Sequence, residues 1–146
     1  MEKRLNVKQA DPSAYKAMLA FDAWSESTSI SKVHRDLIKI RASQINSCSY
    51  CVDMHTLEAR ENGETERRIY ALTSWKETPF FTEEEQAVLA LTEQVTLISN
   101  RVSDETYNVA VKLLGEKYVA EVLMAIIVIN AWNRIGVATN LFPAVN

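Results

Sequence analysis

The chain has 146 residues, a net charge of −3, and ordinary shares of hydrophobic (47%) and charged (24%) residues. This length is typical of one domain spanning 1–146, and the composition excludes a disordered chain or a coiled coil. The sequence holds only three glycines and three prolines. Such a low share implies few turns and favours an all-α fold over a turn-rich β fold.

The distribution of charged and apolar residues argues against a nucleic-acid-binding protein, a secreted protein and a membrane protein. No run of basic residues is present, so we expect no nucleic-acid partner. The first nine residues lack the apolar core of a signal peptide. The longest uninterrupted apolar run, Val122 to Ile129, is much shorter than the roughly 20 residues that span a bilayer. We therefore expect a cytoplasmic protein with no membrane partner.

Capping residues followed by apolar residues at helical spacing predict a compact bundle of about six to seven helices. Pro12 after Asp11 marks the first start, and Thr82 with Glu85 forms a capping box before the fifth helix. The expected helices cover about 12–25, 31–45, 48–61, 65–73, 82–98, 103–114 and 117–132.

The last predicted helix is apolar on most sides between Val122 and Ile129. A helix of this kind must be buried on all sides. In one small domain, two arrangements satisfy that requirement. The helix is either the central core element or shares its burial with another subunit of an oligomer.

The chemistry-bearing residues lie at the start of the third predicted helix, for which Ser47 is the expected N-cap. Cys48, Cys51 and His55 fall on one face of this helix, within about 60° of one another. A helix N-terminus and a nearby imidazole both favour a thiolate, the reactive form of cysteine. The helix dipole favours Cys48 as the attacking thiol, and the spacing to His55 favours Cys51. We prefer Cys51, because a base within reach can also remove the proton.

Other readings of the two cysteines carry less support. They could be buried small hydrophobes, or zinc ligands with His55 and a fourth ligand from Asp36 or His34. A structural zinc site would normally show a second ligand pair, which is missing. The zinc deaminase pattern requires glutamate in place of Asp36 and proline in place of Ser47. Val52 excludes a covalent haem motif, which needs histidine directly after the second cysteine.

Residues 36–46 leading into 48–55 resemble the AhpD-like alkylhydroperoxidase core of the carboxymuconolactone decarboxylase superfamily. The family pattern is an acid, eleven residues, Cys-x-x-Cys, three residues and histidine. Asp36, Cys48, Cys51 and His55 match it. The segment 130–134 also resembles the family's last long helix, so the resemblance covers about 5–142.

The resemblance implies an all-α, obligately oligomeric protein, commonly a trimer or hexamer. It further implies that Cys51 attacks the peroxide, Cys48 resolves the product, His55 is the base and Asp36 is the relay acid. Two departures stand out: Asp36 replaces the usual glutamate, and Tyr50 replaces a histidine between the cysteines. The chain resembles the single-repeat branch, and its two cysteines argue against lactone decarboxylation.

Several residues near this motif have simpler interpretations. We expect His34 to be a surface histidine. Glu58 is expected to be solvated or paired with a neighbour, with orientation of His55 as the alternative. Tyr50 either lines the pocket or packs. The three tryptophans, Trp24, Trp75 and Trp132, are expected in the core or at an interface.

Three hypotheses for function follow. The first is a thiol-dependent hydroperoxide reductase or disulfide oxidoreductase that needs no cofactor, whether flavin, haem or metal. Its electrons come from a lipoyl group, a thioredoxin-like protein or a small thiol. The second is a binding protein whose disulfide switches its assembly or partner. The third is an acid–base enzyme that uses His55 and Asp36, with incidental cysteines.

Overall fold

The computed structural model describes residues 2–144, and every regular element in that part of the chain is helical. The expected all-α fold is therefore confirmed. The α-helices are α1 Val7–Ala10, α2 Pro12–Glu26, α3 Lys32–Ile45, α4 Ser49–Glu61, α5 Glu66–Ala71, α6 Glu83–Thr96, α7 Asp104–Leu114 and α8 Glu116–Ala138. Two 3₁₀ helices, Leu72–Glu77 and Ile98–Asn100, follow α5 and α6.

Side-chain caps set most of the helix starts. Asp11 accepts hydrogen bonds from the backbone N–H groups at the start of α2, and Ser31 and Ser103 do the same for α3 and α7. Thr82 and Glu85 form the reciprocal capping box expected before α6. The seven expected helices are all present. The described part of the chain adds α1, a single turn too short to show apolar periodicity.

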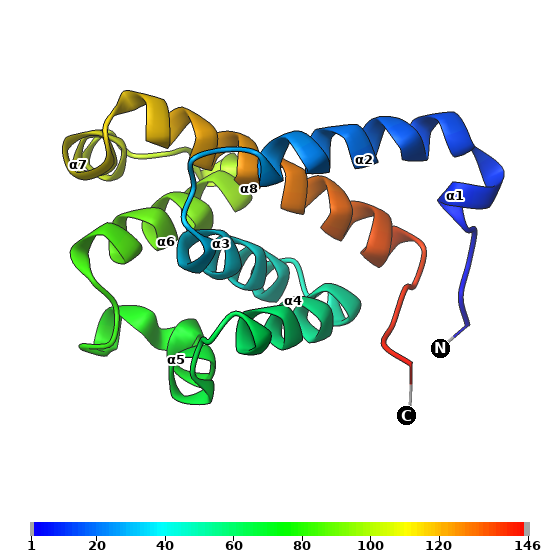
Figure 1. Ribbon diagram of the computed structural model, residues 1–146, viewed down its shortest axis with the longest axis horizontal. Coiled ribbons are helices and arrows are strands. Elements are labelled where there is room, and N and C mark those ends of the chain that lie inside the picture. Colours follow the sequence, from blue (N-terminus) through cyan, green and yellow to red (C-terminus); the bar gives the residue numbers. More distant parts are fainter. Residues whose placement is uncertain (1, 145–146) are drawn as a thin grey trace.

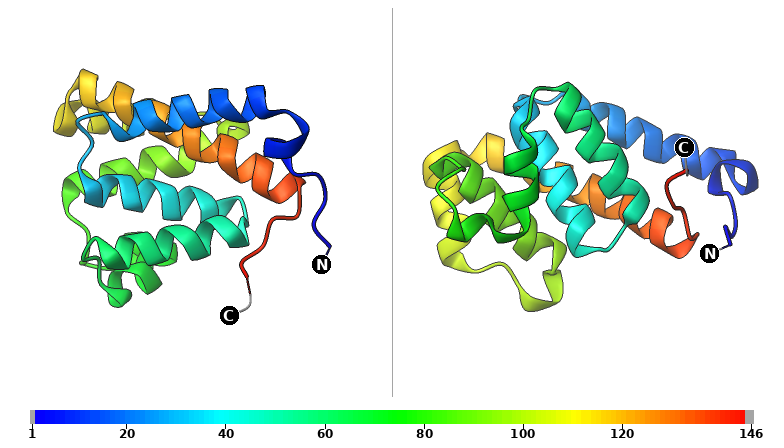
Figure 2. Two further views of the ribbon diagram at one scale, coloured as in Figure 1. Left: turned by 45° about the vertical axis from the view of Figure 1, so that its right-hand side comes forward. Right: turned by 90° about the horizontal axis from the view of Figure 1, so that it is seen from below.

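Helix α8 is the central element of the fold. It contacts α2, α3, α4, α6 and α7, and Figures 1 and 2 show α2 lying along it near the amino-terminal end of the chain. The buried side chains around it form the larger of two apolar clusters. Its most buried members are Ile38, Ala42, Val88, Leu91, Ala110, Val122 and Ile126. Of the two arrangements considered for this helix, the structure shows the central core position; sharing of its burial with another subunit stays a prediction.

By length and composition alone, α8 could also cross a membrane. It contacts five other helices, and half of its most apolar window is buried inside the chain. Met124, Ile127 and Val137 remain exposed. The helix therefore has one face in the core, and the described part of the chain leaves some of its apolar side chains uncovered.

The pair formed by α3 and α4 carries the residues singled out from the sequence. The two helices run side by side, joined by a tight turn, and make more contacts with each other than any other pair (Figure 1). Helix α3 also packs on α6 and α8. Because α3 and α4 both contact α8, the turn that joins them lies beside this helix.

Candidate active site

The two cysteines form a disulfide at the start of α4. Cys48 is the N-cap residue and Cys51 lies in the first turn, and their Sγ atoms are bonded. Both side chains are buried, with 1% and 4% of their surface exposed. The spacing expected to bring the two thiols together is therefore confirmed, and the pair is shown in its oxidised form.

The expected N-cap role of Ser47 is wrong. Ser47 has φ +54°, in the left-handed region, so the chain reverses there and helix α4 begins one residue later. Cys48 occupies the cap position without a side-chain hydrogen bond to the helix. A non-glycine residue in this region costs about 1 kcal/mol, so the turn that presents Cys48 carries local backbone strain.

A buried amide network fixes this turn. The Asn46 side chain donates to Oδ1 of both Asn130 and Asn133, each at 2.9 Å. Asn133 in turn donates to Ser43 Oγ, and Asn130 donates to Thr96 Oγ1. Because Asn130 and Asn133 are buried in α8, these bonds join the turn before Cys48 to the central helix.

Gly136 allows the disulfide to pack closely against α8. A Cβ atom at this position would lie 3.0 Å from Cys48 Sγ and 3.6 Å from Cys51 Sγ. The first distance is closer than ordinary carbon–sulfur packing, so even a methyl group would press on the disulfide. The glycine is therefore required for the close approach of α8 to the two sulfurs.

Replacing Gly136 by alanine should destabilise the oxidised protein, although alanine is the better helix former by about 1 kcal/mol. We expect urea denaturation to show a loss of about 1–2 kcal/mol, the usual cost of overpacking. Ala120 on the exposed face of α8 is the matched control, since Ala120→Gly should show the propensity effect alone. A stabilising Gly136→Ala change would mean that the sulfurs do not rest on this glycine.

His55 lies one helical turn beyond Cys51 and is also buried, with 6% of its surface exposed. Its Nδ1 atom is 2.8 Å from Glu58 Oε2. A carboxylate oxygen can only accept, so Nδ1 carries the hydrogen and Nε2 is the accepting nitrogen of the neutral ring. Burial lowers the pKa of His55, and the hydrogen bond to Glu58 opposes that shift. A neutral imidazole of this kind can act as a base.

Asp36 does not make the hydrogen bond to His55 that its relay role requires. Its Oδ2 atom accepts from Asn62 Nδ2 at 3.0 Å, whereas Glu58 occupies His55 Nδ1. Aspartate is one methylene shorter than the glutamate of the family pattern, which fits its capture by the nearer amide. Burial raises the pKa of Asp36, and the Asn62 hydrogen bond partly offsets this. A catalytic role for Asp36 stays a prediction.

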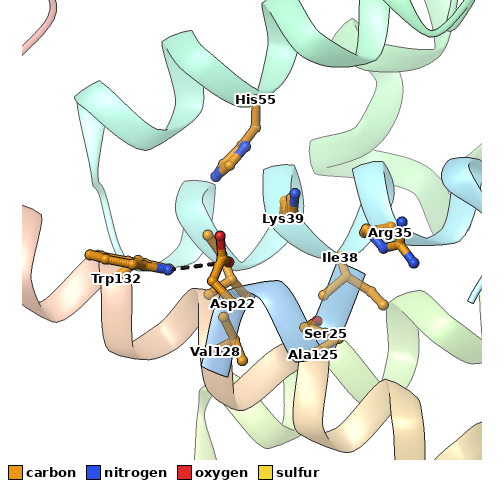
Figure 3. Close-up of a pocket in the computed structure, with 10 residues that line it drawn as sticks. Asp22, Ser25, Arg35, Ile38, Lys39, His55, Ala125, Val128 and Trp132 are labelled. Carbon is orange, nitrogen blue, oxygen red and sulfur yellow. Dashed lines mark hydrogen bonds between the residues drawn. The ribbon is translucent and has the colours of Figure 1, made fainter. Parts of the chain in front are cut away.

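A small cavity adjoins His55. Its volume is about 20 Å³, room for about one water molecule. Figure 3 shows the imidazole pointing from α4 toward Asp22 and Trp132, which are joined by a hydrogen bond, with Lys39 beside it. A larger charged groove of about 410 Å³ shares Asp22, Arg35 and Lys39 with this cavity and includes Asp36 and Glu58. Neither cysteine lines either space.

The structure also tests the expectations for His34 and the tryptophans. The surface position expected for His34 is wrong: it is buried, and its Nδ1 lies 2.7 Å from Tyr118 Oη. Burial lowers its pKa. Trp75 is in the core, whereas Trp24 is exposed. Between residues 2 and 144, no three histidine, cysteine, aspartate or glutamate side chains converge in a geometry suited to a metal ion.

Most of the chain is similar to known proteins. Residues 12–94 match the carboxymuconolactone decarboxylase family. The chain belongs to that family. It is 42% identical to the uncharacterized protein YdfG of Bacillus subtilis (strain 168) over 139 residues, which cover 94% of this chain and 95% of that protein.

Solved structures place the chain more narrowly in that family. The Agrobacterium tumefaciens protein ATU0492, a protein of unknown function that has been proposed to be the antioxidant defence protein AhpD, has a TM-score of 0.96 and 34% identity. The match covers 99% of this chain and 100% of that one. A peroxidase-related protein from Silicibacter sp. TM1040 has a TM-score of 0.78 at 20% identity, covering 88% and 69%, which shows the shared fold alone. The domain is AhpD-like.

Proposed function

We propose that this protein is a thiol-dependent hydroperoxide reductase that works through the Cys48–Cys51 pair. The observation that carries the proposal is the disulfide at the start of α4, with His55 one turn beyond Cys51 on the same helix. Family membership supports a redox role for such a pair. The similarity of the chain to ATU0492, for which an antioxidant defence role has been proposed, supports a peroxide as substrate.

The reaction begins from the reduced pair. His55 takes the proton of the Cys51 thiol, and the thiolate attacks the O–O bond of a small hydroperoxide. One oxygen stays on Cys51 as sulfenic acid, and the other leaves as an alkoxide that takes a proton from His55 to become the alcohol. Cys48 then attacks the sulfenic sulfur, water leaves, and the disulfide forms. The proposed site also includes the carboxyl group of Asp36, which lies buried beside the charged groove.

An external dithiol must return the disulfide to two thiols. A lipoyl group, a thioredoxin-like protein or a small thiol fits this role, and we place the protein in the cytoplasm, where such donors are kept reduced. Reduced protein supplied with dithiothreitol should consume cumene hydroperoxide in proportion to enzyme concentration. Consumption no faster than with dithiothreitol alone would contradict the proposal.

A second candidate is an acid–base enzyme that does not use the cysteines. The observation that favours it is the cavity beside His55, which neither sulfur lines. In that case His55 would transfer protons on a small substrate held in the adjoining groove. A Cys48→Ser, Cys51→Ser double variant would keep its activity toward such a substrate, whereas peroxide reduction would be lost.

We also propose that the chain assembles with copies of itself, as the family resemblance implies. Supporting this, an apolar groove of about 380 Å³ lies along the exposed side of α8, lined by Val95, Ile98 and Ile127 among others. Light scattering coupled to size exclusion should give the mass of a trimer or hexamer. The mass of a single chain, 16.5 kDa, would contradict the proposal.

A further inference from the structure

The hydrogen bond between His55 and Glu58 determines which nitrogen of the imidazole is free. Glu58 lies three residues after His55 on α4, and its Oε2 atom is 2.8 Å from Nδ1. In water the neutral imidazole prefers to carry its hydrogen on Nε2, so the opposite tautomer must be held in place by a partner. Glu58 is that partner here, because its carboxylate requires a donor.

Asp36, the acid that matches the family pattern, has a hydrogen-bond partner other than His55. It accepts from Asn62, the C-cap residue of α4, and is buried on α3. Glu58 has 44% of its side-chain surface exposed in the charged groove, so it can exchange protons with solvent. The two carboxylates therefore have separate partners, and only Glu58 contacts the imidazole.

We propose that Glu58, and not Asp36, is the residue that positions His55 for the thiol reaction. Glu58 holds Nδ1–H and leaves Nε2 as the nitrogen that accepts the proton of the Cys51 thiol. The resulting imidazolium keeps its Nδ1–H bonded to the Glu58 carboxylate, and Nε2–H returns the proton to the leaving alkoxide. Glu58 is a positioning residue, since it acts through His55. The inference rests on the proposed function.

Other charged groups around His55 are part of the same electrostatic balance. Lys39 disfavours the charged ring, and Asp22 and Glu58 favour it. From α8 the cavity receives only the uncharged Trp132 and apolar side chains. The groups facing the site are Asp22 and Glu26 on α2, Arg35, Asp36 and Lys39 on α3, and Glu58 on α4.

The tautomer of His55 is the direct test. Long-range ¹H–¹⁵N correlation spectra of reduced, ¹⁵N-labelled protein show only two imidazoles, because the sequence has two histidines. Tyr118→Phe identifies the His34 signals, since Tyr118 bonds that ring. We expect His55 to be the Nδ1–H form in the wild type and in Asp36→Asn. Glu58→Ala should shift it toward the Nε2–H form, whereas Glu61→Ala, a control from the same groove, should leave it unchanged.

A second readout separates the charge of Glu58 from its hydrogen bond. Glu58→Gln keeps an accepting oxygen, so the tautomer should persist. The neutral amide stabilises the imidazolium less, and alkylation of Cys51 by iodoacetamide at pH 7, in a Cys48→Ser background, should slow by about fivefold. Glu61→Gln should not change that rate.

Two results would overturn the inference. One is an Nε2–H tautomer of His55 in the wild type. The other is a tautomer that changes in Asp36→Asn but persists in Glu58→Ala. Neither readout requires peroxide turnover. A protein with the Nδ1–H tautomer that fails to reduce peroxides would therefore contradict the proposed function and leave this inference standing.

Discussion

Cys51→Ser should lower dithiothreitol-dependent consumption of cumene hydroperoxide by about a thousandfold, because a serine hydroxyl supplies no thiolate to attack the O–O bond. The initial rate of peroxide loss measures this directly. The expected loss is much larger than any effect of altered packing, since both sulfur and oxygen fit the same buried space beside Gly136.

Cys48→Ser is the matched control for this change. It removes the resolving thiol but leaves Cys51 and His55, so one rapid reaction with peroxide should remain and stop at the sulfenic acid. Dimedone should then label Cys51, as detected by mass spectrometry. Equal peroxide consumption by Cys51→Ser and the wild type would mean that the assignment of the attacking thiol is wrong.

Asn133→Ala should destabilise the protein by about 2–4 kcal/mol, because it removes a fully buried amide together with two buried hydrogen bonds and leaves a cavity in their place. Asn133 accepts from Asn46 and donates to Ser43, and both partners belong to the segment that ends α3. Urea denaturation of the oxidised protein measures the free energy of unfolding. The same variant should lower the rate of peroxide reduction, since the turn before Cys48 loses an anchor.

Asn108 provides the matched control for that prediction. It lies exposed on α7, away from the amide network, and Asn108→Ala should change stability by no more than about 0.5 kcal/mol. A comparably small effect of Asn133→Ala would mean that the turn before Cys48 is held by its backbone alone.

The helices themselves were largely predictable from the sequence. Capping residues such as Ser31, Thr82 and Ser103 act locally, so each one identifies a helix start without knowledge of the tertiary fold. The error at Ser47 has the same physical origin. Serine is a good N-cap, but the short connection between α3 and α4 requires one residue in the left-handed region, and tertiary packing assigns it to Ser47.

The candidate site was only partly predictable. Cys48, Cys51 and His55 share one helix, so spacing along α4 was enough to place them together. The partner of His55 depended on a competition between Asp36 on α3 and Glu58 on α4, which the sequence cannot resolve. The position of Asn62 decides it, because its side-chain amide donates to Asp36 and leaves Glu58 as the acceptor for His55 Nδ1–H.

Residues of α8 that complete the site were missed for a related reason. Gly136 and Asn133 belong to a helix more than 80 positions from the cysteines, and contacts at that separation leave no local periodicity. A usable signal existed in the pattern of α8. Buried asparagines and a glycine within a strongly apolar helix indicate points where a neighbouring chain segment bonds or approaches closely.

The most direct test of the account is the loss of titratable thiols after rapid mixing of reduced protein with cumene hydroperoxide. We predict that two thiols per chain disappear far faster than a free thiol reacts, together with formation of the Cys48–Cys51 disulfide. Loss at the rate of a free thiol, or of a single thiol per chain, would contradict the proposal that this pair reduces hydroperoxides.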